Sequence, residues 1–204
     1  MAESNPNSRL EAFSDGVFAI ALTLLIIDIK IPSSVKIDST RDLWNAIIQL
    51  TPSISAFILS FTVILITWVN HHGTLKLVNK TSASFIYANG FLLLTIVFIP
   101  FPTALLGEYI STGHSSPAVI IYDATLALQA VAWILITRVA AKNKLTKDKK
   151  STLLVIKHGK YGYYAFAVYL ICAVTAIWFP LAVALITVII WIFWLMLGIN
   201  LKNE

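Results

Sequence analysis

Long apolar stretches alternate with short polar ones along this chain, and their lengths predict membrane-spanning helices. A helix rises about 1.5 Å per residue, so about 20 apolar residues cover the roughly 30 Å hydrocarbon layer of a bilayer. Pro52 lies inside the second stretch and is expected to kink that helix. The pattern predicts an all-α integral membrane protein with six transmembrane helices, at about 11–31, 43–69, 83–106, 117–141, 162–179 and 181–201.

The composition agrees with a membrane protein, because 58% of the residues are hydrophobic and only 12% are charged. In a chain of 204 residues, six such stretches leave little room for a soluble catalytic module, so we expect a single six-helix transmembrane domain over 1–204. One basic residue precedes the first stretch and no small-residue cleavage pattern follows it. This indicates a retained helix rather than a signal peptide.

The basic residues are unevenly distributed between the two sides of the predicted membrane. Twelve of the fifteen Lys and Arg residues fall on the side that holds both termini, most of them in a basic loop at about 142–160. By the positive-inside rule, both termini are therefore cytoplasmic. The basic loop then needs no nucleic-acid partner, although it can attract anionic lipid headgroups of the bilayer.

The first stretch is an unusual membrane span, because only twelve uncharged residues separate Asp15 from Asp28. Charges in or near the apolar layer generally face protein or water and mark functional paths. One narrow stripe also follows this helix at helical spacing. Taken alone, a stripe of this kind is most often a packing face. Its members are Phe13, Ile20, Thr23, Leu24 and Ile27.

Asp15 lies about 140° around the helix from Ile20, so it points away from the stripe and needs a partner within the helix bundle. Potential donors at the same cytoplasmic level are Arg9, Trp68, Asn70, His71 and His72, which predicts a structural polar network. Three other polar residues within apolar stretches are expected to tie helices together, namely Gln49, Asp123 and Gln129.

No pattern of residues indicates an enzyme or a metal site. His71 and His72 are adjacent, so their side chains diverge by about 100° on a helix, and no carboxylate or cysteine accompanies them at ligand spacing. The sequence also lacks a nucleophile elbow and a glycine-rich phosphate loop. We therefore expect no catalytic residues, no bound metal and no cofactor.

Two motifs resemble those of prokaryotic members of the transmembrane protein 175 family, which are potassium channels. Arg9, Phe13, Ser14 and Asp15 form an Arg-xxx-Phe-Ser-Asp pattern, and Trp68, His71 and His72 end the second apolar stretch. The family repeat has six helices with both ends in the cytoplasm. This chain contains one such repeat, so the resemblance implies a homotetramer in a prokaryotic plasma membrane, with four first helices lining a central pore.

The resemblance also implies roles for individual residues. The family's pore constriction lies five residues after the motif aspartate, which is Ile20 here, and further pore-facing positions map to Thr23, Leu24 and Ile27. The motif residues Arg9, Phe13, Ser14 and Asp15 would support the pore helix together with Trp68 and a histidine. Whether His71 or His72 is that histidine stays open.

The sequence lacks a Thr-Val-Gly-Tyr-Gly filter, so we expect selectivity from a hydrophobic neck at Ile20 and from the Thr23 hydroxyls. An uncharged ring predicts a modest preference for potassium over sodium, and the lack of a visible regular voltage-sensor arginine ladder is compatible with a leak-type channel. The alternative is a proton-coupled secondary transporter with Asp15, Asp28, Asp123 and the histidines as a relay. A non-conducting membrane scaffold is a third interpretation. Against the transporter, no proline interrupts the first helix between Asp15 and Asp28.

Overall fold

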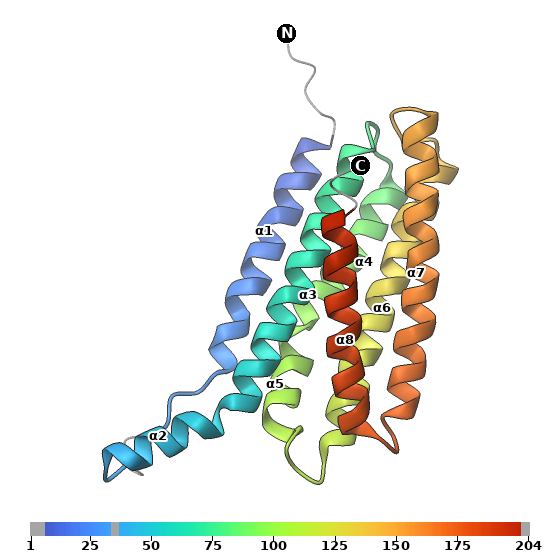
Figure 1. Ribbon diagram of the computed structural model, residues 1–204. Helices are drawn as coiled ribbons and strands as arrows, with labels where there is room; N and C mark the ends of the chain where they lie inside the picture. The colour runs from blue at the N-terminus through green and yellow to red at the C-terminus, as the bar shows by residue number, and fades with distance from the viewer. Residues whose placement is uncertain (1–6, 34–36, 201–204) are drawn as a thin grey trace.

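The computed structural model describes residues 7–33 and 37–200, and its regular elements are helices, which confirms the all-α class. Long helices lie side by side in a bundle, and one short helix projects from its lower end (Figure 1). The elements are α1 Ser8–Leu24, the 3-10 helix η1 Leu25–Asp28, α2 Thr40–Gln49, α3 Thr51–Lys76, α4 Ala83–Phe98, α5 Pro100–Tyr109, α6 Ser115–Lys142, α7 Lys149–Thr175 and α8 Pro180–Asn200.

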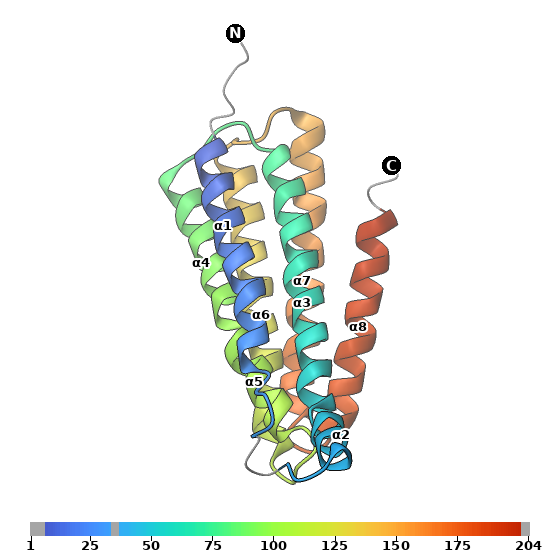
Figure 2. The ribbon, with the colours of Figure 1, turned by 90° about the vertical axis from the view of Figure 1, so that its left-hand side faces the viewer.

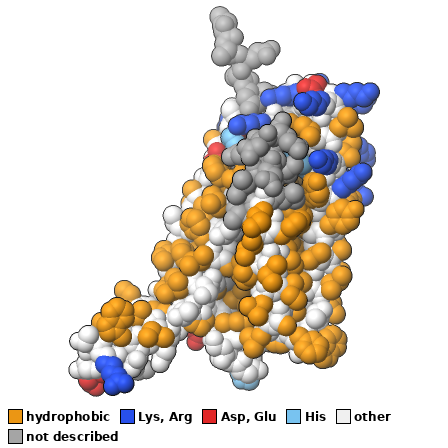
Figure 3. Space-filling view, viewed as in Figure 1, with side chains coloured by type: hydrophobic (Ala, Val, Ile, Leu, Met, Phe, Trp, Pro, Cys, Tyr) orange, Lys and Arg blue, Asp and Glu red, His pale blue; other side chains and the backbone are white. Residues whose placement is uncertain are grey.

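Among the described residues, four stretches are helical, long and apolar enough to cross a membrane. These are Ser8–Asp28, Thr51–Lys76, Ala83–Tyr109 and Ser115–Lys142. Helices α7 and α8 run alongside them (Figure 2), and the count of six crossings stays a prediction. The start of α1 and the end of α8 lie at the same end of the bundle, where Lys and Arg side chains gather (Figure 3).

Helix α6 lies at the centre of the fold and packs against α4, α5, α7 and α8. Two clusters of buried apolar side chains form the core, one around Phe18, Ile64 and Leu126 and the other around Phe85 and Ile136. Two glycines of α7 lie directly against α6. A Cβ at Gly159 would be 2.7 Å from the Thr137 hydroxyl, and one at Gly162 would be 2.9 Å from Ile134. Their missing side chains therefore allow the close α6–α7 packing.

The second apolar stretch is two helices, where one kinked helix was expected. Helix α2 ends at Gln49, and Pro52 lies in the first turn of α3, where its missing N–H leaves no hydrogen bond unmade. Gln49 is exposed on α2, so its expected role as a buried tie between helices is wrong. Pro100 likewise begins α5, so the third stretch is divided into α4 and α5.

The basic loop predicted at about 142–160 is shorter than expected, because α7 already begins at Lys149. The Asp148 carboxylate accepts a hydrogen bond from the Ser151 backbone N–H at 2.7 Å and caps this helix. Hydrogen bonds from Ser151 lower the pKa of Asp148. A single antiparallel bridge between Val78 and Thr146 joins the remaining loop to the α3–α4 connection.

Candidate pore-lining face and its supporting network

Helix α1 and the following η1 turn have one apolar face that the rest of the described chain leaves uncovered. Phe13 is 64% exposed, Ile20 59% and Ile27 67%, and Thr23 and Leu24 are also exposed. The opposite face is buried and consists of Ser14, Phe18, Ala21 and Leu25. The stripe predicted from the sequence is therefore a continuous exposed face of this chain.

Thr23 lies next to Ile20 on this face, one helical turn further along. Its Oγ1 donates a hydrogen bond to the Ile20 carbonyl oxygen at 2.8 Å. Because the hydroxyl proton is engaged with the helix, the oxygen's remaining lone-pair capacity is available on the exposed face. The arrangement places a potential cation ligand directly beside the apolar side chain of Ile20.

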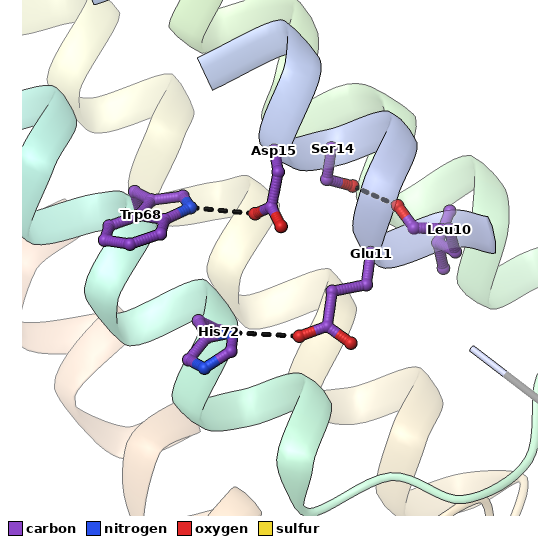
Figure 4. Close-up of polar contacts among 6 residues, drawn as sticks. All are labelled: Leu10, Glu11, Ser14, Asp15, Trp68 and His72. Atoms are coloured by element: carbon purple, nitrogen blue, oxygen red, sulfur yellow. Dashed lines mark hydrogen bonds and ion pairs between the residues drawn. The ribbon is translucent and has the colours of Figure 1, made fainter. Parts of the chain in front are cut away.

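Two polar contacts join α1 to α3 (Figure 4). The Trp68 indole Nε1–H donates to Asp15 Oδ1 at 2.8 Å, and His72 Nδ1 lies 2.8 Å from Glu11 Oε1. Glu11 and Asp15 are four residues apart on α1, and Trp68 and His72 are four residues apart on α3. The two contacts therefore lie one turn apart along the facing sides of the two helices. The rings of Trp68 and His72 stack with their centroids 6.1 Å apart.

A second set of hydrogen bonds joins α1, α4 and α3 through Asn89. The Asn89 amide Nδ2 donates to Ser14 Oγ at 3.0 Å, and His71 Nε2 lies 2.6 Å from Asn89 Oδ1. Ser14 in turn donates to the Leu10 carbonyl oxygen at 2.8 Å. With the amide oxygen facing His71, the imidazole Nε2 carries the proton that it donates. All three side chains are buried.

The structure places the predicted motif residues in several different environments. Ser14, Asp15, Trp68, His71 and His72 all take part in contacts that hold α1 against its neighbours. Both histidines are therefore used, with different partners. Arg9 is exposed and forms no ion pair with any described residue, and Phe13 lies on the exposed stripe.

Sequence reasoning missed Glu11 and Asn89. Glu11 could have been found because it lies four residues before Asp15 on the same helical face, opposite the Trp68–His72 spacing. Asn89 stands alone in the apolar run of α4, and an isolated amide in such a run indicates a contact between helices without identifying its partners.

Two other buried polar residues also connect helices. Gln129 Nε2 donates to Thr67 Oγ1 at 2.8 Å, which joins α6 to α3. Thr187 Oγ1 donates to Asp123 Oδ1 at 3.0 Å, which joins α8 to α6. Within the described part of the chain, no three His, Cys, Asp or Glu side chains converge on a point that could hold a metal ion.

Comparison with known proteins points to one family. A family model described as the endosomal/lysosomal potassium channel TMEM175 matches residues 9–100, which include both motifs. A potassium channel from Chamaesiphon minutus is 37% identical over 191 residues, covering 92% of this chain and 94% of that protein. A potassium channel from Streptomyces collinus is 42% identical over 130 residues, covering 63% of this chain and 62% of that protein.

The fold is also similar to a solved structure. The crystal structure of a lysosomal potassium-selective channel TMEM175 homolog from Chamaesiphon minutus aligns with a TM-score of 0.81 and 33% sequence identity. The alignment covers 94% of this chain and 97% of that one. The likeness therefore extends over nearly the whole bundle and is not confined to the motif-bearing helices.

Proposed function

Since this chain belongs to the TMEM175 family of potassium channels, we propose that it forms a potassium-permeable cation channel in a prokaryotic cell membrane. The observation that carries the proposal is the apolar stripe on α1 and η1, which one copy of the chain leaves exposed. An exposed apolar face within a bundle of this kind needs a lipid or protein neighbour. Four copies related by a central axis would bring four such stripes together around one pore.

The narrowest part of this pore would be a ring of four Ile20 side chains. A ring of apolar side chains excludes water when it is narrow, so an ion must shed part of its hydration shell to pass. The Thr23 oxygens, one turn away, would stabilise the partly dehydrated cation. Potassium holds its shell less tightly than sodium, so the ring would favour potassium. Because the ring has no fixed charge, the preference would be modest.

The contacts on the other side of α1 support this role. Asp15, Glu11 and Ser14 each bond to a neighbouring helix, so α1 is held at its cytoplasmic half by three side chains that do not face the stripe. Fixing the helix in this way keeps Ile20 at a constant distance from the proposed axis. We assign these residues to support of the pore helix rather than to contact with the ion.

The orientation of the channel follows from its charge. Most of the described basic side chains gather at the end where α1 begins and α8 ends (Figure 3), and this end would face the cytoplasm. No regular ladder of arginines marks a voltage sensor among the described helices, and the short connections leave little room for a regulatory domain. Both points favour a leak-type channel.

Recording from purified protein in planar bilayers tests the proposal. Under opposed potassium and sodium gradients, the wild type should show unitary currents whose reversal potential favours potassium. Ile20→Asn should enlarge the current and reduce the preference, because the amide wets the neck. Leu94→Asn is the matched control, since Leu94 is equally exposed but lies on α4, away from the stripe. Its currents should match those of the wild type.

Other outcomes would point elsewhere. Unchanged currents in Ile20→Asn would remove Ile20 from the pore. Saturable, pH-driven flux without unitary currents would support a proton-coupled secondary transporter instead. For that function the buried carboxylate of Asp123, held by Thr187 on α8, would be the first residue to replace. Absence of any flux from correctly assembled protein would favour the non-conducting scaffold.

A further inference from the structure

Helix α2 projects from the lower end of the bundle and carries an apolar face that the described chain leaves largely uncovered (Figure 1). No residue of this helix is buried. Trp44 is 62% exposed and Ile48 64%, and the apolar residues recur at helical spacing on one face. This face consists of Leu43, Trp44, Ile47 and Ile48, and the opposite face carries Asn45 and Gln49. A contiguous exposed apolar face of this kind marks an interaction surface.

Helix α2 extends toward the side of the molecule on which α1 exposes its stripe. It reaches past the lower end of α1 in Figure 1, and both helices face the viewer in Figure 2. Its ten residues span about 15 Å, more than the width of about 10 Å of a single helix, so α2 reaches beyond the surface of its own chain. When four stripes surround one axis, the space that α2 enters belongs to another copy of the chain rather than to lipid.

Rotation about that axis identifies the surface that α2 meets. Helix α1 lies between α4 on one side and α3 on the other, and α2 leads directly into α3 (Figure 2). An axis in front of α1 therefore brings the α3 side of one copy toward the α4 side of the next, in a closed head-to-tail ring. Toward the lower end of the bundle α4 continues into α5, so α2 of one copy faces the α4–α5 junction of its neighbour.

The junction between α4 and α5 exposes two aromatic rings. Phe98 is 46% exposed and Phe101 52%, and their ring centroids lie 5.4 Å apart. Aromatic rings bind one another in edge-to-face or offset-stacked geometry. The Trp44 indole on the apolar face of α2 supplies a third ring for this pair.

The two surfaces also carry opposite charges. Arg41 lies seven residues before Ile48 on α2, and Glu108 lies seven residues after Phe101 on α5, so each charge shares the helical face of its apolar neighbour. Both charged side chains are exposed, and neither forms an ion pair with a described residue. An ion pair at the edge of an interface adds little affinity but helps to determine which surfaces meet.

We propose that the apolar face of α2 docks on the α4–α5 junction of the neighbouring copy, with Trp44 against its Phe98 and Phe101 rings and Arg41 beside its Glu108. This docking rests on the proposed function, because it requires four α1 stripes around one axis. Each α2 then joins two copies at the lower end of the bundle, and four such contacts close the ring outside the pore.

Cysteine cross-linking of the full chain in membranes tests the contact. In a Cys172→Ser background, which removes the only native cysteine, Trp44→Cys and Phe101→Cys together should give covalent dimers to tetramers on denaturing gels after treatment with a short bismaleimide. Each of the two single-cysteine variants should stay monomeric. The matched control is Asn45→Cys with Phe101→Cys, which should also stay monomeric because Asn45 lies on the polar face of α2.

Charge reversal tests the pairing of the two surfaces independently. In the protein with cysteines at positions 44 and 101, Arg41→Glu should reduce the cross-linked yield, because two carboxylates then face each other. Adding Glu108→Arg should restore the yield. Two changes that each harmed folding would instead reduce it further, so recovery in the double reversal is specific to residues that face each other.

Each contrary outcome has a distinct meaning. Monomers alone, from protein that runs as a tetramer on native gels, would overturn the docking of α2 and leave the pore proposal standing. Equal cross-linking from the Asn45→Cys control, or no recovery in the double reversal, would also contradict the docking. Wild-type protein that never forms a tetramer would reject both proposals. A spin label on Trp44→Cys that is relaxed more by oxygen in the bilayer than by a water-soluble nickel complex would place α2 on lipid instead.

Discussion

Asn89 on α4 joins three helices, because its side-chain amide forms hydrogen bonds with Ser14 on α1 and with His71 on α3. Asn89→Leu keeps the size of the side chain but removes the acceptor of the buried His71 Nε2–H and the donor to Ser14 Oγ, which keeps its own bond to the Leu10 carbonyl oxygen. A buried donor left unpaired costs about 1–3 kcal/mol, so we expect a clear fall in the thermal midpoint of unfolding in detergent. Asn45→Leu, at an exposed site on α2, should leave the midpoint unchanged. Equal midpoints for the two variants would contradict the assigned network.

Asp15 offers a sharper test, because two substitutions at one position should behave differently. Asp15→Asn keeps an oxygen that can accept the Trp68 indole N–H, whereas Asp15→Leu leaves this half-buried donor unpaired. We expect Asp15→Leu to reduce the tetramer fraction on native gels and Asp15→Asn to restore most of it. The reversal potential of assembled channels should be the same for both. Normal assembly with altered ion selectivity would place Asp15 in the permeation path instead.

For single residues, the sequence predicts which side of a helix a side chain lies on better than it predicts the residue that the side chain contacts. The helical period placed Ile20 and Asp15 on different sides of α1, and the structure has the first exposed and the second bonded to α3. Neither partner of Asn89 could be identified, because a contact between helices depends on how each is rotated and offset. Arg9 was one of several possible partners that the sequence offered for Asp15. It is exposed in the structure, and a guanidinium near the bundle end can remain in water at lower cost than in a buried pair.

Close packing between elements depends on individual glycines. A Cβ at Gly107 on α5 would lie 2.9 Å from the Ser53 Cα on α3, so the added atom meets backbone that cannot rotate away. Gly107→Ala should therefore destabilise the protein by about 1–3 kcal/mol. The control is Gly90→Ala on α4, where a Cβ meets nothing within 4 Å. That change should stabilise the helix slightly, by up to about 1 kcal/mol. Similar chemical-denaturation curves for both variants would refute the close α3–α5 contact.

Apolar runs in the sequence locate the parts of helices that lie in lipid rather than whole helices. Helix α7 begins at Lys149, about one-half of its length before the apolar run at 162–179, because the Asp148 cap and the glycines against α6 stabilise a polar segment that hydropathy does not detect. Conversely, the run at 43–69 hides a break at Leu50, since α2 and α3 are both apolar enough to look continuous. The ends of these helices depend on capping residues and on packing against distant helices, and a local average of hydropathy detects neither.

In the whole molecule, the fold of a single chain leaves an apolar stripe exposed on α1, but it does not determine what covers that stripe. Lipid and a second protein face are both apolar, so burial alone does not distinguish a lipid-facing helix from a pore-lining one. The tetramer comes from the family resemblance and is a proposal about four copies. A direct test must therefore detect whether the same residue from several copies of the chain lies close together around one axis.

Zinc coordination provides such a report. In a Cys172→Ser background, which removes the only native cysteine, Ile20→Cys would place four thiols around the proposed axis. Thiolates bind Zn²⁺ tetrahedrally with Zn–S distances of about 2.3 Å, so converging cysteines should let Zn²⁺ block the current at concentrations that leave the background protein open. Leu94→Cys, exposed on α4, should show no added sensitivity because its four thiols stay far apart. Block that is equal at both positions, or absent at Ile20, would mean that the α1 stripe faces lipid and that the pore lies elsewhere.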